Sequence, residues 1–290
     1  MMDQITAGAP SLAELQRDPE TAWSLSADLK PVPLDEARHR SGHTVLVKRQ
    51  SRVALFLSAV QEDGHRYIYK IYWVPGGLRW RTPLMVSRAN REFTALAMAY
   101  KAGLRVVKPV RWRDVRHSGV LVCSTLSVRY VPGFSIAHLL KNTATPDERR
   151  RNLGDAAGVL LRQLHQGGLY WASSYPRNFL VPEDGGELMA LDTPYAEWHG
   201  RDLSGSLYAA QDLEQLLWNG FGEWGFTTKE HEAILGGYCK AEPELLGATR
   251  VLAARQRGWQ RKWKRARTRA ASVLHRPSHM AGGGGGFDSG

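Results

Sequence analysis

The chain has 290 residues, of which 43% are apolar, and a formal net charge of +11 at pH 7. This length predicts two lobes or domains around a substantial buried core. No run of about 18 apolar residues occurs, which excludes a spanning helix, and the N-terminus lacks the pattern of a signal peptide. Cys123 and Cys239 lie far apart in apolar segments, which favours buried thiols over a disulfide. We therefore expect a soluble or peripheral cytoplasmic protein.

The positive charge is concentrated near the C-terminus. Ten Lys or Arg residues and one acid, Asp288, lie from Arg250 onward, so this segment carries +9 and the remainder +2. Residues 250–276 are predicted to form a basic helix with interspersed tryptophan, and the glycine-rich end is predicted to be disordered. Such a helix is typical of contact with an anionic membrane surface, of nucleic-acid binding, or of a simply solvated terminus.

Residues 1–41 are punctuated by proline and are expected to form an extension packed on the main body, with a short helix capped by Ser11. Three strands are then predicted, at residues 43–47, 52–57 and 66–74, with a linker at residues 48–51. The expected result is an antiparallel meander, with Lys70 near the middle of its third strand.

A helix is predicted from Arg88 to Lys101, begun by Ser87 and ended by Gly103. Glu92 lies on this helix. Two further strands are predicted at residues 106–110 and 120–128, followed by a connector at residues 130–133.

The second half is predicted to be mainly helical. Thr145 and Pro146 are expected to cap and begin a helix that runs to His165. Further helices are predicted at residues 135–140, 211–217 and 228–238, the last capped by Thr227.

Residues 164–192 read as a helix end, a polar loop and a β-hairpin. The loop contains Ser173 and Asn178, the hairpin turns at residues 183–186, and Asp192 ends its second strand. Amide and carboxylate oxygens are the hard ligands that Mg²⁺ prefers. The alternative to a metal site is a structural role for each residue: Asn178 would form an Asx turn, and Asp192 would cap a turn.

Lys70 and Glu92 form a second candidate pair. A lysine inside an apolar strand is costly unless its ammonium is paired, and a helical glutamate soon afterwards is a natural partner. The alternative is an edge-strand lysine whose ammonium reaches water beside an unrelated surface glutamate. Their order within a meander followed by a helix favours the functional interpretation.

The order and spacing of these motifs resemble the protein-kinase-like fold, and most closely the bacterial lipopolysaccharide core kinases, the heptose and Kdo kinase family. The resemblance spans about residues 42–240, and the stretches that carry it include Tyr69-Lys70, Ser87 to Phe93, Ala102 to Leu104, Leu164 to Tyr170, Asn178 to Val181, Leu191-Asp192 and Asp212 to Leu217.

The resemblance implies a two-lobed α+β fold, with a β-rich N-lobe at residues 42–130 and a helical C-lobe at 131–249. It also implies that Lys70 binds the phosphates of ATP with Glu92 as its partner, and that Asn178 and Asp192 bind magnesium. The resemblance further implies that the protein transfers phosphate from ATP to a sugar hydroxyl of a glycolipid at the inner membrane face. Such a substrate favours membrane contact over nucleic-acid binding for residues 250–276.

The sequence departs from the family pattern in the catalytic loop. Trp171 and Ser173 stand where the family carries a histidine and the catalytic aspartate. A neutral serine does not accept a proton as a carboxylate does, and general-base catalysis contributes roughly 10²–10⁴ in rate. Glu183 and Glu197 are the nearby acids that could substitute. The departure leaves two hypotheses: a lipopolysaccharide kinase, or a pseudokinase that binds Mg-nucleotide as a scaffold or regulator in envelope assembly.

The phosphate-binding glycine loop is also absent. Lys48 and Arg49 are the cations that could contact phosphate in its place.

Overall fold

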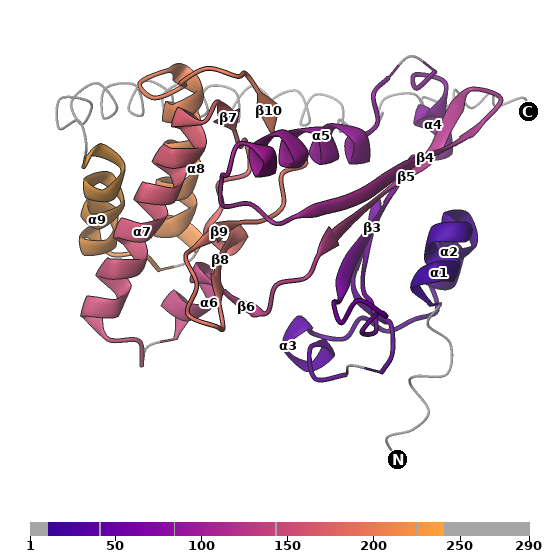
Figure 1. The fold of residues 1–290 in the computed structure, drawn as a ribbon, viewed down its shortest axis with the longest axis horizontal. Coiled ribbons are helices and arrows are strands. Elements are labelled where there is room, and N and C mark those ends of the chain that lie inside the picture. The colour runs from indigo at the N-terminus through magenta and orange to yellow at the C-terminus, as the bar shows by residue number, and fades with distance from the viewer. Residues whose placement is uncertain (1–10, 41, 84, 143, 224, 241–290) are drawn as a thin grey trace, which may run out of the picture.

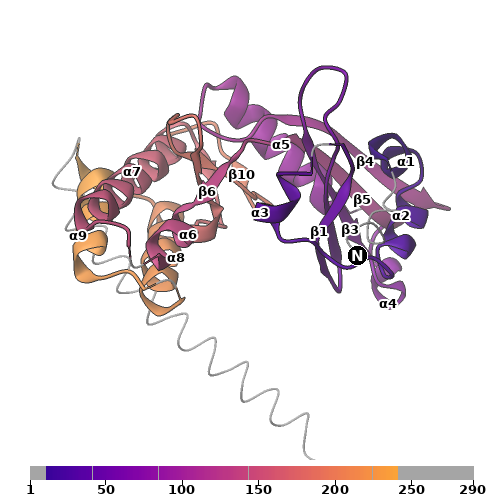
Figure 2. The same cartoon turned by 90° about the horizontal axis from the view of Figure 1, so that it is seen from below.

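The computed structural model describes residues 11–40, 42–83, 85–142, 144–223 and 225–240. Within these ranges the chain folds into a β-rich lobe and a helical lobe that lie side by side (Figures 1 and 2). The predicted basic helix at residues 250–276 and the glycine-rich end lie outside the described residues. None of the described helices is both long and apolar enough to cross a membrane.

One antiparallel five-stranded sheet, in the order β1-β2-β3-β5-β4, forms the β-rich lobe. Its strands are β1 (Val45–Gln50), β2 (Val53–Leu57), β3 (Tyr67–Trp73), β4 (Pro109–His117) and β5 (Val120–Arg129).

Two strand predictions were wrong. Residues 48–50 belong to β1 rather than to a linker, because a bulge lets the pairing with β2 continue to Gln50 opposite Val53. The strand predicted at residues 106–110 begins only at Pro109, and Val106 makes an isolated bridge with Ala190 of the helical lobe instead.

Five helices accompany the sheet: α1 (Leu12–Arg17), α2 (Pro19–Leu25), α3 (Leu34–Ala37), α4 (Gly76–Arg79) and α5 (Arg88–Lys101). The predicted bounds of α5 and its Ser87 cap are confirmed, and so is the Ser11 cap of α1. Trp23 of α2 stacks on Trp73 of β3 with ring centroids 5.3 Å apart, so the N-terminal helices pack on one face of the sheet.

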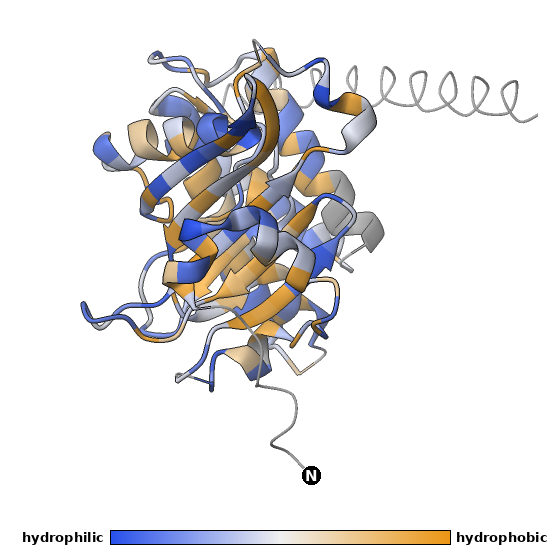
Figure 3. Cartoon of the chain, turned by 90° about the vertical axis from the view of Figure 1, so that its right-hand side faces the viewer, coloured by the Kyte–Doolittle hydropathy of each residue, from blue (hydrophilic) through white to orange (hydrophobic). Residues whose placement is uncertain are grey.

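Strand β3 divides its side chains between two environments because successive residues point to opposite faces. Tyr69 and Ile71 join the core beneath α1 and α2, whereas Tyr72 joins the larger core that continues into the helical lobe. Lys70 shares the face of Tyr72 and therefore points toward the helical lobe. In Figure 3 hydrophobic residues gather along the strands and inward helix faces, and hydrophilic residues along the peripheral loops.

The helical lobe contains four α-helices and several short elements within the described residues. These are β6 (Gly133–Ser135), α6 (Ile136–Lys141), α7 (Asp147–Gln166), β7 (Leu169–Tyr170), a 3₁₀ turn η1 (Pro176–Asn178), β8 (Phe179–Pro182), β9 (Met189–Ala190), β10 (Glu197–Trp198), α8 (Leu207–Glu223) and α9 (Thr228–Cys239).

Helices α7 and α9 pack closely through two glycines. A Cβ on Gly158 would lie 2.1 Å from the carbonyl oxygen of Ile234, and one on Gly237 would lie 2.2 Å from that of Asp155. No larger residue fits either position without moving backbone. Helix α7 also starts one residue later than predicted, because Pro146 has extended backbone angles and occupies the N-cap position in place of Thr145.

The two cysteines are free and buried, as the sequence predicted. Burial raises the pKa of Cys123 to about 12, so its thiol stays protonated at physiological pH.

Candidate functional site

A cleft of about 490 Å³ lies between the two lobes. Apolar side chains from the sheet, from the β8–β9 hairpin and from the segments next to them line much of it, including Val47, Val53, Leu55, Ile68, Val107, Val128, Leu180 and Leu191. Its polar lining includes Lys48, Lys70, Arg88, Arg177, Asn178 and Asp192. An apolar slot with a few converging polar groups is the usual form of a small-molecule site.

Lys70 joins the two lobes within this cleft. Its Nζ lies 2.7 Å from Oε1 of Glu92 on α5 and 2.9 Å from Oδ1 of Asp192 after β9. The Lys70–Glu92 pair suggested by the sequence is therefore formed. Lys70 also pairs with the carboxylate of Asp192, which lies 122 positions further along the chain. Glu92 is fully buried, whereas 45% of the Asp192 side-chain surface is exposed.

Among the residues that the structure describes, Glu92 accepts from three donors. Besides Lys70, the hydroxyl of Tyr72 donates to its Oε2, and the backbone N–H of Thr193 donates to its Oε1 at 3.3 Å. A buried carboxylate with this many donors has its charge compensated and its position fixed. Glu92 therefore holds the lysine, the strand and the segment after Asp192 in one arrangement.

Burial alone would favour a neutral amine at Lys70, yet the charges of Asp192 and Glu92 raise its pKa well above the ordinary value. Burial alone would also raise the pKa of Asp192, but the Lys70 cation, followed by Arg88 and Lys48, lowers it below the ordinary value. Both groups are therefore ionised at neutral pH, and the cleft presents an excess of positive charge around one carboxylate.

Asn178 lies on η1 with its side chain buried, and its Nδ2 donates to the backbone oxygen of Ser173 at 2.8 Å. An amide whose nitrogen is committed in this way offers only its oxygen to a cation. Asn178 and Asp192 both line the cleft, so their donor set of one amide and one carboxylate oxygen fits a hard divalent cation.

No cluster of three or more His, Cys, Asp or Glu side chains suited to a metal occurs in the part of the chain that the structure describes. A cation such as Mg²⁺ uses one or two protein carboxylates and takes its other ligands from water and phosphate.

The backbone at Asp192 is left-handed, with φ of +50°. Such angles cost energy in residues other than glycine and persist where the surroundings hold them. The hydrogen bond from Thr193 to Glu92 and a second from the Trp171 indole Nε1 to the Asp192 oxygen, at 3.3 Å, hold this turn.

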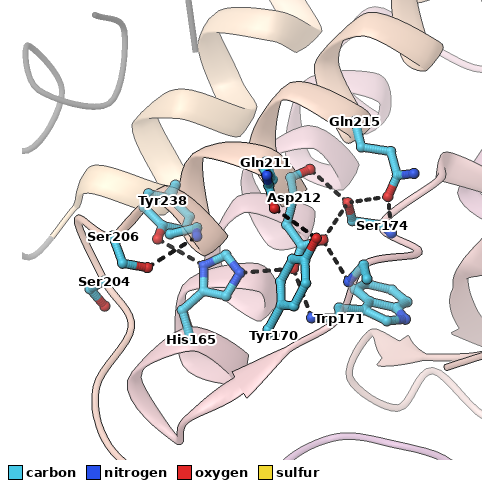
Figure 4. A network of polar contacts seen from close by, with 12 residues as sticks. His165, Tyr170, Trp171, Ser174, Ser204, Ser206, Gln211, Asp212, Gln215 and Tyr238 are labelled. Atoms are coloured by element: carbon cyan, nitrogen blue, oxygen red, sulfur yellow. Dashed lines mark hydrogen bonds and ion pairs between the residues drawn. The ribbon is translucent and has the colours of Figure 1, made fainter. Parts of the chain in front are cut away.

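Asp212 on α8 organises the loop that precedes Asn178 (Figure 4). Its carboxylate accepts from the backbone N–H groups of Trp171 and Ala172, both at 2.8 Å, and from the ring of His165 at 3.1 Å. Ser174 Oγ donates to the Asp212 backbone oxygen at 2.6 Å. Ala172 has φ of +57°, so the carboxylate also holds a strained residue in place.

Ser173 is 3% exposed, and its carbonyl oxygen accepts from Asn178 and from the Tyr175 N–H at 2.8 Å. Neither acid considered as its substitute lines the cleft. Glu183 pairs with Arg38, and Glu197 lies on β10 with a side chain that is 61% exposed, 3.5 Å from His199. Among the described residues that line the cleft, Asp192 is the only acid.

Lys48 lines the cleft, but the expectation for Arg49 was wrong. Alternation along β1 sends Arg49 to the other face of the sheet, where its guanidinium lies over the Trp23 ring and donates to Ser26. Sequence reasoning also missed the role of Asp212, although an acid within an apolar helix signals a buried partner. It missed Tyr72 and Arg88, for which the sequence offered no comparable signal.

A lysine–glutamate pair between β3 and α5, facing an asparagine and an aspartate across an interlobe cleft, defines a protein-kinase-like fold. The sequence profile of the lipopolysaccharide kinase (Kdo/WaaP) family matches residues 35–238. The chain belongs to this family. No curated protein sequence matches the chain significantly.

Solved structures share the fold. WaaP in complex with acyl carrier protein superposes with a TM-score of 0.50 at 17% sequence identity, over 77% of this chain and 92% of that one. The similarity supports the two-lobed, kinase-like architecture.

Proposed function

We propose that this protein is an ATP-dependent kinase that transfers a phosphoryl group to a sugar hydroxyl of a cell-envelope glycolipid. The observation that carries the proposal is the position of Lys70, whose ammonium lies between Glu92 and Asp192 in the interlobe cleft. Membership of the lipopolysaccharide kinase family supports a core sugar as the acceptor class.

Different residues of the cleft would bind the base, the phosphates and the metal ion of the nucleotide. The apolar slot between the sheet and Leu180 suits a nucleotide base, and Lys70, held by Glu92, would bind the phosphates. Asn178 and Asp192 would hold Mg²⁺, which neutralises phosphate charge when it is bound. Because phosphoryl transfer depends largely on positioning and on charge stabilisation, these residues supply most of what the reaction needs.

A pseudokinase is the second candidate, and Ser173 is the observation that favours it. A proton leaving the acceptor hydroxyl meets no carboxylate other than Asp192 among the described residues of the cleft. In this case the protein would bind Mg-nucleotide as a scaffold or regulator in envelope assembly.

One measurement separates these two functions, and a second tests the nucleotide binding that both require. Transfer of labelled phosphate from ATP to core glycolipid is expected for the kinase, and Ser173→Asp should raise its rate by up to roughly 10²–10⁴. If only Ser173→Asp transfers phosphate, the native chain is a pseudokinase. Both functions predict that Mg-ATP raises the melting temperature and that Asp192→Ala abolishes this rise; an unchanged melting temperature at saturating Mg-ATP counts against both.

A glycolipid acceptor places the reaction at a membrane surface. We therefore propose peripheral contact with anionic lipid at the inner membrane through residues 250–276, rather than binding to nucleic acid. Cosedimentation with vesicles of phosphatidylglycerol and phosphatidylethanolamine should require these residues. Equal cosedimentation of a chain truncated after residue 249 would contradict this role.

A further inference from the structure

Arg88 is a polar residue of the cleft that the function proposed above does not use. It is the first residue of α5, it lines the cleft with Lys70 and Asp192, and it lies four residues before Glu92 on the same helix face. Glu92 would be its natural ion-pair partner. Instead, Lys70, Tyr72 and Thr193 occupy the oxygens of Glu92.

Two aromatic rings orient the Arg88 guanidinium. Its Cζ lies 4.6 Å from the centroid of the Tyr72 ring and 5.1 Å from that of Tyr195. Tyr72 is fixed in turn by its hydrogen bond to Glu92. Because guanidinium groups stack on aromatic faces without losing their donors, this arrangement fixes the plane of the group and leaves its edge for a ligand.

The Nε atom of Arg88 is buried and has no hydrogen-bond partner among the described residues. A buried donor without a partner is costly, and it requires an explanation such as a missing ligand. The positive end of the α5 helix dipole also favours an anion near Arg88.

The charged residues near Asp192 indicate which anion Arg88 would bind. Lys48, Lys70 and Arg88 line the cleft together with Asp192, the group proposed to bind Mg²⁺. Lys70 is bound to both carboxylates, whereas Arg88 Nε has no hydrogen-bond partner among the described residues, and its guanidinium lies against Tyr195, three residues after Asp192. Arg88 is therefore the cation of the cleft that we assign to a phosphate beyond those bound by Lys70.

We propose that Arg88, held against Tyr72 and Tyr195, binds the terminal phosphate of the nucleoside triphosphate. The proposal rests on the nucleotide-binding function above and adds to it a residue that distinguishes a triphosphate from a diphosphate. Planar guanidinium groups are suited to this task because they offer two parallel donors to phosphate oxygens.

Calorimetric titration of the full chain with ATP and with ADP, at one fixed Mg²⁺ concentration, tests this role. Arg88→Met should weaken ATP binding by about 10–100-fold, the usual loss for one charge-assisted contact, and change ADP binding by less than about threefold. Arg91→Met is the matched control, since Arg91 is exposed on the same helix one turn further on. It should bind both nucleotides like the wild type.

Retained ADP binding by Arg88→Met shows that the variant is folded. Equal weakening of ATP and ADP, or unchanged ATP binding, would overturn the assignment to the terminal phosphate while leaving nucleotide binding intact. If the wild type binds neither nucleotide, the proposed function fails and this inference fails with it.

Discussion

The charged cluster of the cleft differs in its side chains from the loop that lies next to it, where Trp171 contacts the Asp192 backbone. The cluster of Lys70, Glu92 and Asp192 combines one cation and two carboxylates from three separate elements. The loop from Trp171 to Ser174 is also held by several polar contacts, because the Asp212 carboxylate accepts hydrogen bonds from its backbone at two positions. Yet this loop presents no carboxylate to the cleft. The backbone of this loop is therefore held in place although the loop contains no acidic side chain.

The contrast suggests that different forces hold the two regions. The loop depends on hydrogen bonds from its own backbone to a buried acid, so its shape is independent of the side chain at position 173. The charged cluster depends on contacts between side chains that we also propose to bind the nucleotide and Mg²⁺. Substitutions whose effects on the free energy of unfolding and on ligand binding differ therefore test the comparison between the loop and the charged cluster.

The largest expected effect belongs to Asp212→Ala. This change leaves the N–H groups of Trp171 and Ala172 without their acceptor, and it should lower the free energy of unfolding by about 3–5 kcal/mol. Urea denaturation measures the loss. The exposed Asp202, which accepts from the Ser204 N–H at 2.7 Å, provides the control, and Asp202→Ala should cost under about 1 kcal/mol. Equal losses in the two variants would show that Asp212 does not organise the loop.

Glu92→Ala should lower the free energy of unfolding by about 3 kcal/mol, because Lys70 and Tyr72 lose a buried partner. The double variant Lys70→Met/Glu92→Leu removes both charges, and it should recover more than half of that loss. It should still show no rise in melting temperature with Mg-ATP. Denaturation curves with and without Mg-ATP test both points. If the double variant were less stable than Glu92→Ala, the main contribution of the charged pair would be to the free energy of unfolding rather than to ligand binding.

Ala172→Gly should stabilise the protein by roughly 0.5–1 kcal/mol. The left-handed backbone at Ala172 is costly for alanine and accessible to glycine. Thermal denaturation against Ala172→Val, whose branched side chain should destabilise the same position, measures the effect. A destabilised glycine variant would indicate that flexibility, rather than strain, limits this loop.

The smallest expected effect is a pH dependence at Asp192. Its folded-state pKa lies below the ordinary 3.8, so its contribution to stability is present above that value and is lost as the pH falls through the folded pKa. The raised pKa of Lys70 keeps the ammonium charged throughout this range. Because the Asp192 side chain is 45% exposed, the contribution should be under about 1 kcal/mol.

Urea denaturation of the wild type and of Asp192→Asn measures this contribution. Their difference in free energy of unfolding should be constant from pH 5 to pH 8 and should shrink toward pH 3. A difference that grows on acidification would contradict the assigned direction of the shift.

The sequence alone determined the elements whose signals are local. Helix α5 begins and ends at its predicted residues, because Ser87 caps it and Gly103, with φ of +74°, ends the helical path. The hairpin that carries Asn178 and Asp192 followed from its turn residues and apolar strands. The order of motifs also indicated the kinase-like fold and the family.

Only the tertiary structure decided what depends on contacts distant in the chain. Val106 pairs with the helical lobe rather than extending β4, since Ala190 lies beside it. Asp212 accepts from a loop about 40 positions earlier in the chain, and Arg49 points away from the cleft because β1 continues through it and alternates its side chains between the two faces. Local spacing reports which way a side chain points relative to its own element, whereas its partner depends on how the two lobes pack. For this reason the sequence indicated Lys70 and Glu92 as a pair, and the fold added Asp192 and placed Arg88 beside them.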